Sequence, residues 1–393
     1  MIGVIADDLT GAAELGAVGL RHGLRAEIVR SGGPSGRAGL ICVDTDSRSC
    51  EPAVAAKRAA AAAKLLQAAG ARWIYKKVDS VLRGQVTAEV EAVMKQLHLE
   101  RALLLPANPS LGRTIRDGQY FVKGQPIHKT EFARDPEYPR RSSQVVRLLA
   151  APEKFLLRVV NGDHTLSDGT IVIGETSTSA DVLGWTAYCN SATLPAGGSE
   201  FFNALLAAET VPAPAAEPEA APDLEPAGGR EFFISGTSTR AARQFAQLAK
   251  KRKTPVFALP QELAWGAEFT PEAVTAVTQR VVDSFQLHDR VILAVGLPPV
   301  RNVNIARRLA NSVVRVAEQV MRRVPMARVY AEGGATAAEL VRRMGWARLT
   351  VLRELAPGVA TLAVDGGGES LLLTIKPGTY AWPEQWTASP VVC

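Results

Sequence analysis

A dense cluster of charged and hydroxyl side chains lies in the segment YKKVDSVLRG, residues 75–84. Its polar members fall within eight residues and are Lys76, Lys77, Asp79, Ser80 and Arg83. The segment starts in a predicted strand and ends before a predicted helix, where a helix N-terminus can hold an anion. A solvated charged turn is the alternative, but the cluster follows a buried strand rather than decorating a helix face. We therefore interpret it as a binding site, toward which only one of the two adjacent lysines points.

A pair of carboxylates lies in ADDLTG, residues 6–11, directly after the apolar run Ile2–Ala6. Two adjacent carboxylates at a strand end are costly unless they meet a ligand, a cation or helix amides. We expect either Asp7 or Asp8 to cap the helix that follows, through its side-chain oxygen. The other carboxylate is then a candidate for contact with a substrate.

The segment DTDSR, residues 44–48, follows another predicted strand, Gly39–Val43. Arg48 has the geometry to hold a carboxylate through two parallel hydrogen bonds. The alternative is a salt bridge from Arg48 to Asp44 or Asp46.

A long stretch with little periodicity runs over residues 106–139, and such loops are usually binding loops or lids. Its candidate polar contacts are Asn108, Arg113, His128, Thr130, Glu131 and Asp135. His128 is either a proton carrier or a hydrogen-bonded loop residue.

Glycine-rich turns mark the second half of the chain. ISGTST (residues 234–239) and EGGATAAEL (residues 332–340) each follow a predicted strand and precede a predicted helix. Small residues there leave backbone amides open to phosphate. VDGGGE (residues 364–369) and KPGTY (residues 376–380) add further glycines, although turns use glycine commonly. Neither the P-loop pattern nor a G-x-G-x-x-G after the first strand is present, which argues against a P-loop enzyme and a typical dinucleotide fold.

Strand and helix patterns alternate on both sides of one Pro-rich segment. The remaining predicted strands are Arg72–Lys76, Ala102–Leu105, Phe232–Ile234, Val291–Val295 and Arg328–Tyr330. The predicted helices are Ala12–Arg21, Ala53–Ala69, Thr87–Leu97, Ala241–Lys250, Pro271–Phe285 and Asn302–Arg323. This alternation predicts an α/β fold in which helices flank mostly parallel sheets. Ligands bind such sheets beyond the carboxyl ends of the strands, where the motifs above lie.

The domain organisation follows from length and composition. A chain of 393 residues exceeds what one hydrophobic core usually serves. Residues 207–229 are built mainly of Ala, Pro and Glu, and repeated prolines exclude a regular helix or strand. We therefore predict a first domain at 1–206, a linker at 207–229 and a second domain at 230–393.

Composition narrows the function classes. The net charge of +6 is mild, and its basic residues are scattered apart from short clusters at Lys250–Lys253 and Arg140–Arg141. This pattern does not indicate a nucleic-acid partner, although it suits an anionic ligand. The four cysteines form no C-x-x-C pair, and no signal peptide or long apolar span is evident. We expect a cytoplasmic protein that does not bind membranes.

Together these motifs resemble the four-carbon acid sugar kinase family, in the family's order and over nearly the whole chain. ADDLTG, DTDSR, YKKVDSVLRG and GQPIHKTEFARDP resemble its substrate-binding N-terminal domain. SGTST, EGGATA and KPG resemble its nucleotide-binding C-terminal domain. The resemblance implies ATP-dependent phosphorylation of a small anionic acid such as threonate, erythronate or 3-oxo-tetronate, in the cleft between the domains. It also implies Mg²⁺, for which the sequence names no ligands.

The resemblance also assigns roles to residues. Nucleotide contacts would come from Ser235, Gly333, Gly334, Ala335, Thr336 and Gly378. The acid would contact Arg48, Lys76, Asp79, Ser80, Arg83, Asn108 and Arg113, and Asp8 or Asp7 would accept the proton of the attacking hydroxyl. Asp79 and His128 are the next candidates for that base.

This sequence departs from the family pattern at three places. The family commonly has an acidic residue at position 335, a small polar residue at position 81 and a glycine shortly after Gly378. Here these places hold Ala335, Val81 and the run TYAWPE. Two other functions stay open: a non-catalytic sensor of sugar acids and nucleotides, which the missing acidic residue at position 335 permits, and a sugar-acid isomerase or dehydrogenase on an α/β scaffold. A homodimer is also left open.

The linker prediction can be tested by replacement. Exchanging residues 211–226 for a Gly/Ser segment of equal length should leave the melting temperature unchanged, because this composition buries no core. Calorimetric melting of both chains measures this, and a large drop in the melting temperature would contradict the boundary.

Overall fold

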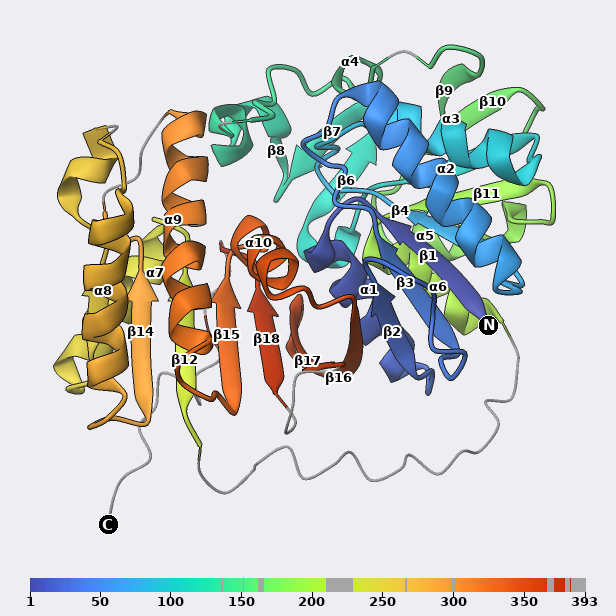
Figure 1. Cartoon of the computed structure of the whole chain (residues 1–393). Helices are drawn as coiled ribbons and strands as arrows, with labels where there is room; N and C mark the ends of the chain where they lie inside the picture. The colour runs from blue at the N-terminus through green and yellow to red at the C-terminus, as the bar shows by residue number, and fades with distance from the viewer. Residues whose placement is uncertain are drawn as a thin grey trace. The chain divides into compact units, whose positions relative to one another are not determined.

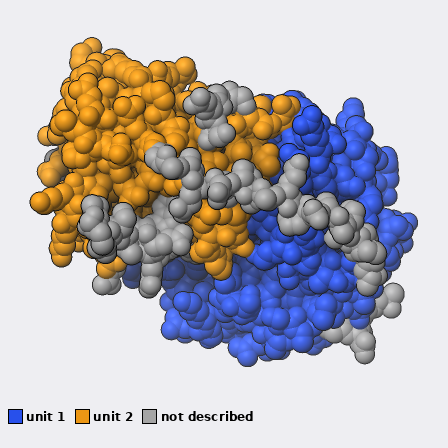
Figure 2. Space-filling model, turned by 90° about the horizontal axis from the view of Figure 1, so that it is seen from below, with its two compact units in different colours: residues 1–216 blue, residues 217–393 orange. Residues whose placement is uncertain are grey.

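The computed structural model describes residues 1–135, 137–150, 152–161, 166–209, 229–265, 267–297, 302–365, 371–378 and 382. The chain forms two compact units, residues 1–216 and 217–393, which Figure 2 colours separately. Most of the predicted linker lies outside the described residues, as do the glycines of VDGGGE and most of TYAWPE. Among the described residues, no helix is both long and apolar enough to span a membrane.

Unit 1 is built on a parallel sheet with strand order β2-β3-β1-β4-β11-β5-β10-β9. Its strands are β1 Ile2–Ala6, β2 Ala26–Val29, β3 Leu40–Asp44, β4 Ile74–Lys77, β5 Arg101–Leu105, β9 Leu156–Val160, β10 Thr170–Gly174 and β11 Thr193–Gly197. Its helices are α1 Leu9–Arg21, α2 Pro52–Ala68, α3 Val86–Leu97, α4 Val145–Leu148, α5 Ser179–Trp185 and α6 Ser199–Ala208, with a 3₁₀ turn at Thr186–Tyr188.

Strand β4 shows how the two faces of this sheet are covered. Ile74 belongs to the core cluster that also contains residues of α2 and α3, which pack on each other. Tyr75 points to the other face and contacts the rings of Phe201 and Phe202 on α6, at centroid distances of 6.0 and 5.1 Å. Alternation along the strand thus buries its side chains under helices on both faces, which a mostly apolar parallel strand requires.

The crossover connections diverge at the neighbouring strands β1 and β4. From β1 the chain passes through α1 to β2, toward one end of the strand order. From β4 it passes through α3 to β5, toward the other end (Figure 1). The loops after two such strands separate and leave a crevice, where open α/β sheets bind ligands. Asp7 and Asp8 follow β1, and Asp79 follows β4.

The stretch after β5 is more regular than its sequence predicts. It contains an antiparallel sheet of β6 Arg113–Arg116, β7 Gln119–Val122 and β8 Gln125–Pro126. The 3₁₀ turns Pro109–Leu111, Ile127–Lys129 and Glu131–Arg134 flank it. The expectation of an irregular loop is therefore wrong. Its strands are too short for alternation to be recognised, and tight turns with positive φ at Asp117, Gly118, Lys123 and Gly124 connect them.

Unit 2 has the strand order β13-β14-β12-β15-β18-β17-β16. Its strands are β12 Glu231–Ser235, β13 Val256–Ala258, β14 Arg290–Ala294, β15 Arg328–Glu332, β16 Arg348–Ala356, β17 Val359–Val364 and β18 Leu372–Lys376. Its helices are α7 Arg240–Lys251, α8 Pro271–Ser284, α9 Val303–Met321 and α10 Gly334–Met344, with a 3₁₀ turn at Gln261–Trp265. The first five strands in this order are parallel, and β17 is antiparallel to both β18 and β16. The predicted α/β class, with mostly parallel sheets, is confirmed.

The connections of unit 2 also diverge at neighbouring strands. From β12 the chain leads through α7 to β13, whereas from β15 it leads through α10 toward β16 (Figure 1). The glycine-rich turns ISGTST and EGGATAAEL follow these two strands.

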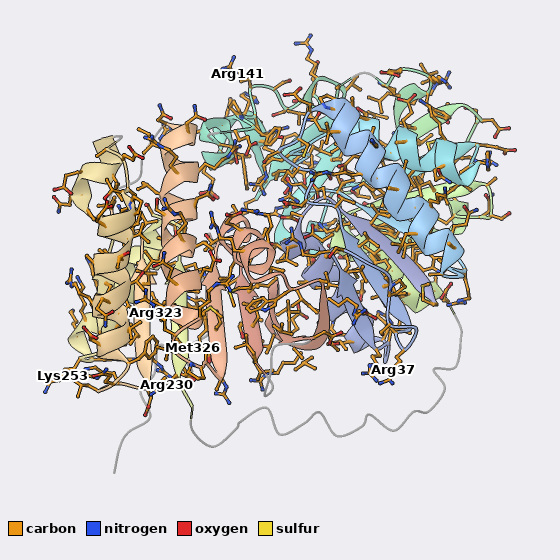
Figure 3. The ribbon with its side chains drawn as sticks, in the orientation of Figure 1. Arg37, Arg141, Arg230, Lys253, Arg323 and Met326 are labelled. Atoms are coloured by element: carbon orange, nitrogen blue, oxygen red, sulfur yellow. The ribbon has the colours of Figure 1, made fainter. Side chains whose placement is uncertain are left out.

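Basic side chains at the other end of this sheet are remote from those turns. Figure 3 labels Arg230 and Lys253, which lie toward the end of unit 2 where its strands begin. Arg230 precedes β12, and Arg323 lies between α9 and β15. The basic cluster seen in the sequence at 250–253 therefore lies at the amino ends of the strands, and the glycine-rich turns lie at their carboxyl ends.

One glycine of unit 1 has no room for a side chain, and this gives a prediction. A Cβ on Gly197 would lie 2.1 Å from the Leu105 carbonyl oxygen. Gly197→Ala should therefore lower the free energy of unfolding by about 2 kcal/mol or more. Gly184→Ala is the control, because its Cβ meets nothing within 4 Å and its helix should gain about 0.5 kcal/mol. Urea unfolding measures both, and equal effects would contradict the packing described.

Candidate functional sites at the strand ends

Arg48 joins the motifs that follow β1, β3 and β4. Its Nε and Nη2 donate to the two carboxylate oxygens of Asp7 at 2.7 and 2.9 Å, and its Nη1 donates to Asp8 Oδ2 at 2.7 Å. The same Nη1 lies 3.7 Å from Asp79 Oδ2. Three segments far apart in the sequence therefore meet at one guanidinium group.

The alternative interpretation, a salt bridge from Arg48 to Asp44 or Asp46, is wrong. Both of these carboxylates pair with Arg30, whose Nε lies 2.7 Å from Asp44 Oδ2 and whose Nη2 lies 3.2 Å from Asp46 Oδ2. Arg30 lies just after β2, which neighbours β3, and this strand was not predicted. Arg48 is thereby left to the aspartates after β1.

Asp7 and Asp8 have different surroundings. The Asp7 side chain is 3% exposed and the Asp8 side chain 21% exposed. Burial disfavours the charge on Asp7, but Arg48 outweighs it and holds the pKa of Asp7 below its ordinary value. Burial raises the pKa of Asp8 against the opposing effect of Arg48. Asp8 also caps α1, since its Oδ1 accepts from the Gly11 amide at 2.8 Å.

The two adjacent lysines of β4 reach different helices, as strand alternation predicts. Lys76 has no exposed side-chain surface and pairs with Glu89 of α3 at 2.9 Å. Lys77 pairs with Glu14 of α1 at 3.3 Å, and its Nζ also donates to the Val78 carbonyl. The expectation that Lys76 contacts a ligand is not met in this arrangement, because its ammonium group is enclosed.

Glu89 connects this buried lysine to the segment that carries Arg48. Its Oε1 accepts from the Ser47 hydroxyl at 2.5 Å, while its Oε2 faces Lys76. The Ser47 amide donates to the Asp7 carbonyl at 3.0 Å. The buried Lys76–Glu89 pair therefore fixes the turn from which Arg48 extends.

Asp79 holds its own turn together and pairs with Arg83. Its Oδ1 accepts from the amides of Val81 and Arg83, each at 3.1 Å. Its Oδ2 lies 2.7 Å from Arg83 Nη2. Burial opposes the charge on Asp79, but Arg83 and Arg48 outweigh it, so its pKa lies well below the ordinary value. Such a carboxylate is a poor proton acceptor near neutral pH. Its partner Arg83 is about one-third exposed and can therefore reach a ligand.

The segment after β5 is tied to these motifs by hydrogen bonds. Arg113 donates to the Ser80 hydroxyl, and the Tyr120 hydroxyl donates to the Ser80 carbonyl. The Tyr138 hydroxyl donates to the Arg48 carbonyl, and Asp135 lies 3.4 Å from Arg83 Nη1. The structure therefore brings the small antiparallel sheet onto the KKVDS segment, and the later residue Tyr138 onto the DTDSR segment.

Two predicted candidates of this segment have hydrogen-bond partners of their own, and the Asn108 carbonyl also accepts from the Arg113 amide. His128 is hydrogen-bonded through Nδ1 to the Ser143 hydroxyl at 2.7 Å, which fits a loop residue rather than a proton carrier. Asn108 is buried, and its Oδ1 accepts from the Glu200 amide at the start of α6.

The turn after β11 was not predicted from the sequence. Gly197 pairs in register with Lys77, and a Cβ on Gly198 would lie 2.5 Å from Asn108 Oδ1. The run AGGSE has the same strand–glycine–helix signal as the turns that were recognised, and it could have been found that way. Glu14 and Glu89 carried no such signal, because a helix surface is a usual place for glutamate.

In unit 2 the glycine-rich turns meet at the ends of β12, β15 and β18. We call the residues Ser235–Thr237, Gly333–Thr336 and Gly378 the glycine cradle. A Cβ on Gly236 would lie 1.9 Å from Thr336 Oγ1, and a Cβ on Gly378 would lie 3.1 Å from Thr237 Oγ1. The turns therefore touch only because these positions lack side chains.

Backbone groups and a helix start complete the cradle. Gly333 has φ +104°, a conformation that side-chain-bearing residues rarely adopt. Helix α10 begins at Gly334, with Thr336 buried and Ala335 exposed in its first turn. The predicted residues Ser235, Gly333 to Thr336 and Gly378 thus lie together, where a helix N-terminus offers free amides to an anion.

Known proteins match both units. A family model described as a sugar-binding N-terminal domain matches residues 2–180, and one described as a nucleotide-binding C-terminal domain matches residues 233–380. The chain belongs to the four-carbon acid sugar kinase family. The resemblance seen in its motifs is therefore confirmed.

Individual relatives differ in how much they cover. A D-threonate kinase of Salmonella typhimurium is 37% identical over 37% of this chain and 36% of its own length. A 3-oxo-tetronate kinase of Methylobacterium radiotolerans is 25% identical over 96% of both chains. A D-threonate kinase of Cupriavidus necator is 28% identical over 91% of this chain and 88% of its own.

Solved structures share the fold. A Salmonella typhimurium LT2 protein described as a putative tRNA synthase has a TM-score of 0.77 at 18% identity, covering 98% of this chain and 97% of its own. A Haemophilus influenzae protein of the DUF1537 family has a TM-score of 0.70 at 19% identity, covering 98% and 99%. At these identities the likeness shows the fold alone.

The buried pair in unit 1 gives a stability prediction. Glu89→Gln leaves Lys76 enclosed without a counter-charge, and breaking a buried ion pair typically costs about 3–5 kcal/mol. Lys95→Gln on the same helix breaks the pair with Glu91 and should cost under about 1 kcal/mol, because Lys95 is 39% exposed and Glu91 keeps the hydrogen bond from the Glu153 amide. Urea unfolding compares the two, and similar small losses would contradict the role given to Glu89.

Proposed function

We propose that this protein uses ATP to phosphorylate a hydroxyl group of a small acid sugar of about four carbons, such as threonate, erythronate or 3-oxo-tetronate. The observation that carries the proposal is the meeting of the family's unit 1 motifs at Arg48, at the strand ends where such sheets bind ligands. Relatives that align over most of this chain are kinases of such acids.

In this proposal, unit 1 binds the acid. Arg83 is the most exposed cation beside the aspartate cluster and offers a charge-assisted contact to a carboxylate. Ser80, after β4, and Arg113, at the start of β6, are hydrogen-bonded to each other and offer further polar contacts. Arg48 orients the two aspartates and does not bind the acid, because its three nitrogens are already engaged with them.

Asp8 is the general base of the proposal. It is more exposed than Asp7, and its raised pKa makes it the better proton acceptor of the two. Its second oxygen holds the amide of Gly11, so the carboxylate is fixed in orientation. Asp7 instead neutralises Arg48 within the buried part of the cluster.

Unit 2 takes the nucleotide in this proposal. Phosphoryl transfer depends on positioning and charge neutralisation, which helix amides and glycine turns supply. The cradle fits a phosphate chain because α10 begins at Gly334 beside these turns, and the amides of its first turn have no partner within the helix. Mg²⁺ accompanies ATP in such reactions and neutralises phosphate charge. Among the described residues, no cluster of acidic, His and Cys side chains forms a metal site, so the phosphates themselves would supply its ligands in large part.

One observation favours a second candidate, a non-catalytic sensor of sugar acids and nucleotides. Ala335 is exposed in the first turn of α10, where the family commonly has an acidic side chain. A chain without that carboxylate could keep binding and lose turnover.

We also propose a cytoplasmic location. Cys42, Cys50 and Cys189 are free thiols, as is usual in a reducing compartment, and ATP is a cytoplasmic substrate.

Turnover with a panel of acids tests the proposal. Threonate, erythronate and 3-oxo-tetronate, with two-carbon and six-carbon acids as controls, are incubated with ATP and Mg²⁺, and ADP release is measured together with the phosphorylated product by ³¹P NMR. At least one four-carbon acid should give stoichiometric ADP and phosphate ester. Binding of acid and nucleotide without turnover would support the sensor, and no binding of either would contradict both.

The two aspartates give separable variants. Asp8→Asn should lower kcat by about 10²- to 10⁴-fold, because the amide keeps the shape but loses proton affinity. Asp7→Asn should lower mainly the free energy of unfolding, because it removes the buried partner of Arg48. In the wild type, kcat should rise with pH through the raised pKa of Asp8, since the base acts ionised. Near-full kcat in Asp8→Asn at saturating substrate would place the base elsewhere.

A further inference from the structure

Three neighbouring strands of unit 2 end in a row of polar residues. Ser235 of β12 pairs in register with Glu332 of β15, which pairs in register with Lys376 of β18. In parallel strands, residues in register point to the same face, so these side chains lie side by side. The cradle glycines Gly236 and Gly333 follow the first two directly.

The side chains of this row are bonded to one another and buried. Glu332 Oε2 accepts from the Ser235 hydroxyl at 2.6 Å, and Oε1 lies 2.7 Å from Lys376 Nζ. Lys376 Nζ also donates to the Pro377 carbonyl at 3.0 Å. Exposure is 6% for Ser235, 2% for Glu332 and 1% for Lys376. We call these three residues the strand-end row.

An aromatic group closes the row on the Lys376 side. The Trp382 ring centroid lies 5.1 Å from Lys376 Nζ. Trp382 packs edge-on against Phe233 and Tyr330, at 5.7 and 6.0 Å, and these two rings stack on each other at 4.1 Å. A cation over an aromatic face is stabilised, and more so when desolvated. Trp382 belongs to the run that replaces the family's late glycine, so this departure has a structural use.

The same backbone carries the cradle. The Gly236 amide donates to the Glu332 carbonyl at 3.3 Å, and the Gly333 amide donates to the Lys376 carbonyl at 2.9 Å. The strand-end row therefore joins the last residues of β12, β15 and β18, directly before the turns that follow these strands. A shift of Glu332 would move the turns after β12 and β15 together.

From this geometry we infer that Glu332 is a positioning residue of the nucleotide site: it sets the spacing of the glycine turns and the direction of the Ser235 hydroxyl. The inference rests on the proposed function, since it assigns the cradle to a nucleotide. An ionised carboxylate only accepts hydrogen bonds, so the Ser235 proton points at Glu332. Toward a nucleotide Ser235 then offers lone pairs, which suit a hydroxyl or amino group rather than a phosphate oxygen.

Binding of ADP measured by calorimetry tests this inference. Glu332→Gln should weaken ADP binding by about 10- to 100-fold, as expected when hydrogen bonds to a charged group are lost. Binding of the acid should stay unchanged. Glu339→Gln on α10, whose carboxylate pairs with Arg342 and Arg343 away from the cradle, is the matched control and should bind ADP as the wild type does.

A double variant separates positioning from general destabilisation. Glu332→Gln removes the carboxylate beside the buried Lys376, whereas Glu332→Leu with Lys376→Met removes both charges and should recover the melting temperature. Positioning predicts that ADP affinity stays low in this double variant, because leucine offers the Ser235 hydroxyl no acceptor. Recovery of affinity together with stability would overturn the inference, and the double variant decides the matter if the single one does not fold.

The outcomes distinguish this inference from the proposed function. If the wild type binds no nucleotide, the proposed function and the inference both fail. If the wild type binds ADP and Glu332→Gln binds it equally well, the inference alone is overturned.

Discussion

The ion pairs of the Arg48 guanidinium group hold the candidate site of unit 1 together. Asp7 and Asp8 face it directly, and Asp79 lies within 4 Å of it. Carboxylates this close together cannot all ionise unless a cation lies among them, because each would raise the pKa of the others. Arg48 lowers the pKa of Asp7, and Arg83 together with Arg48 lowers that of Asp79, whereas burial raises the pKa of Asp8 against Arg48. Burial and the two arginines thus give the three aspartates different chemistry.

The two units meet the same electrostatic constraint in similar ways. In each, a glutamate accepts from a serine and pairs with a fully buried lysine: Glu89 with Ser47 and Lys76 in unit 1, and Glu332 with Ser235 and Lys376 in unit 2. A buried ion pair gains little net stability, but losing one partner is expensive. Such a pair therefore holds a strand end in one arrangement, which a site built from loops needs.

The sequence predicted the parts of this structure that depend on local pattern. Strands β1, β3 and β12, helices α2 and α8, and the placement of motifs at strand ends were all evident. Strand β11 was missed because its run TLPAG contains a proline and a glycine, which usually mark loops. Strands β6 to β8 were missed because each is short. Partners set by tertiary packing, such as Glu89 for Lys76 and Asp7 for Arg48, could not be predicted, because no spacing in the sequence specifies which helix covers a strand.

A crystal structure of the chain with ADP and a four-carbon acid that it turns over would test the account most directly. We expect the acid in unit 1, with a hydroxyl in hydrogen-bond contact with Asp8 and its carboxylate beside Arg83. We expect the ADP phosphates in unit 2, against the amides of Gly334 to Thr336 at the start of α10. Finding both ligands in one unit, or the acid in the glycine cradle, would contradict it.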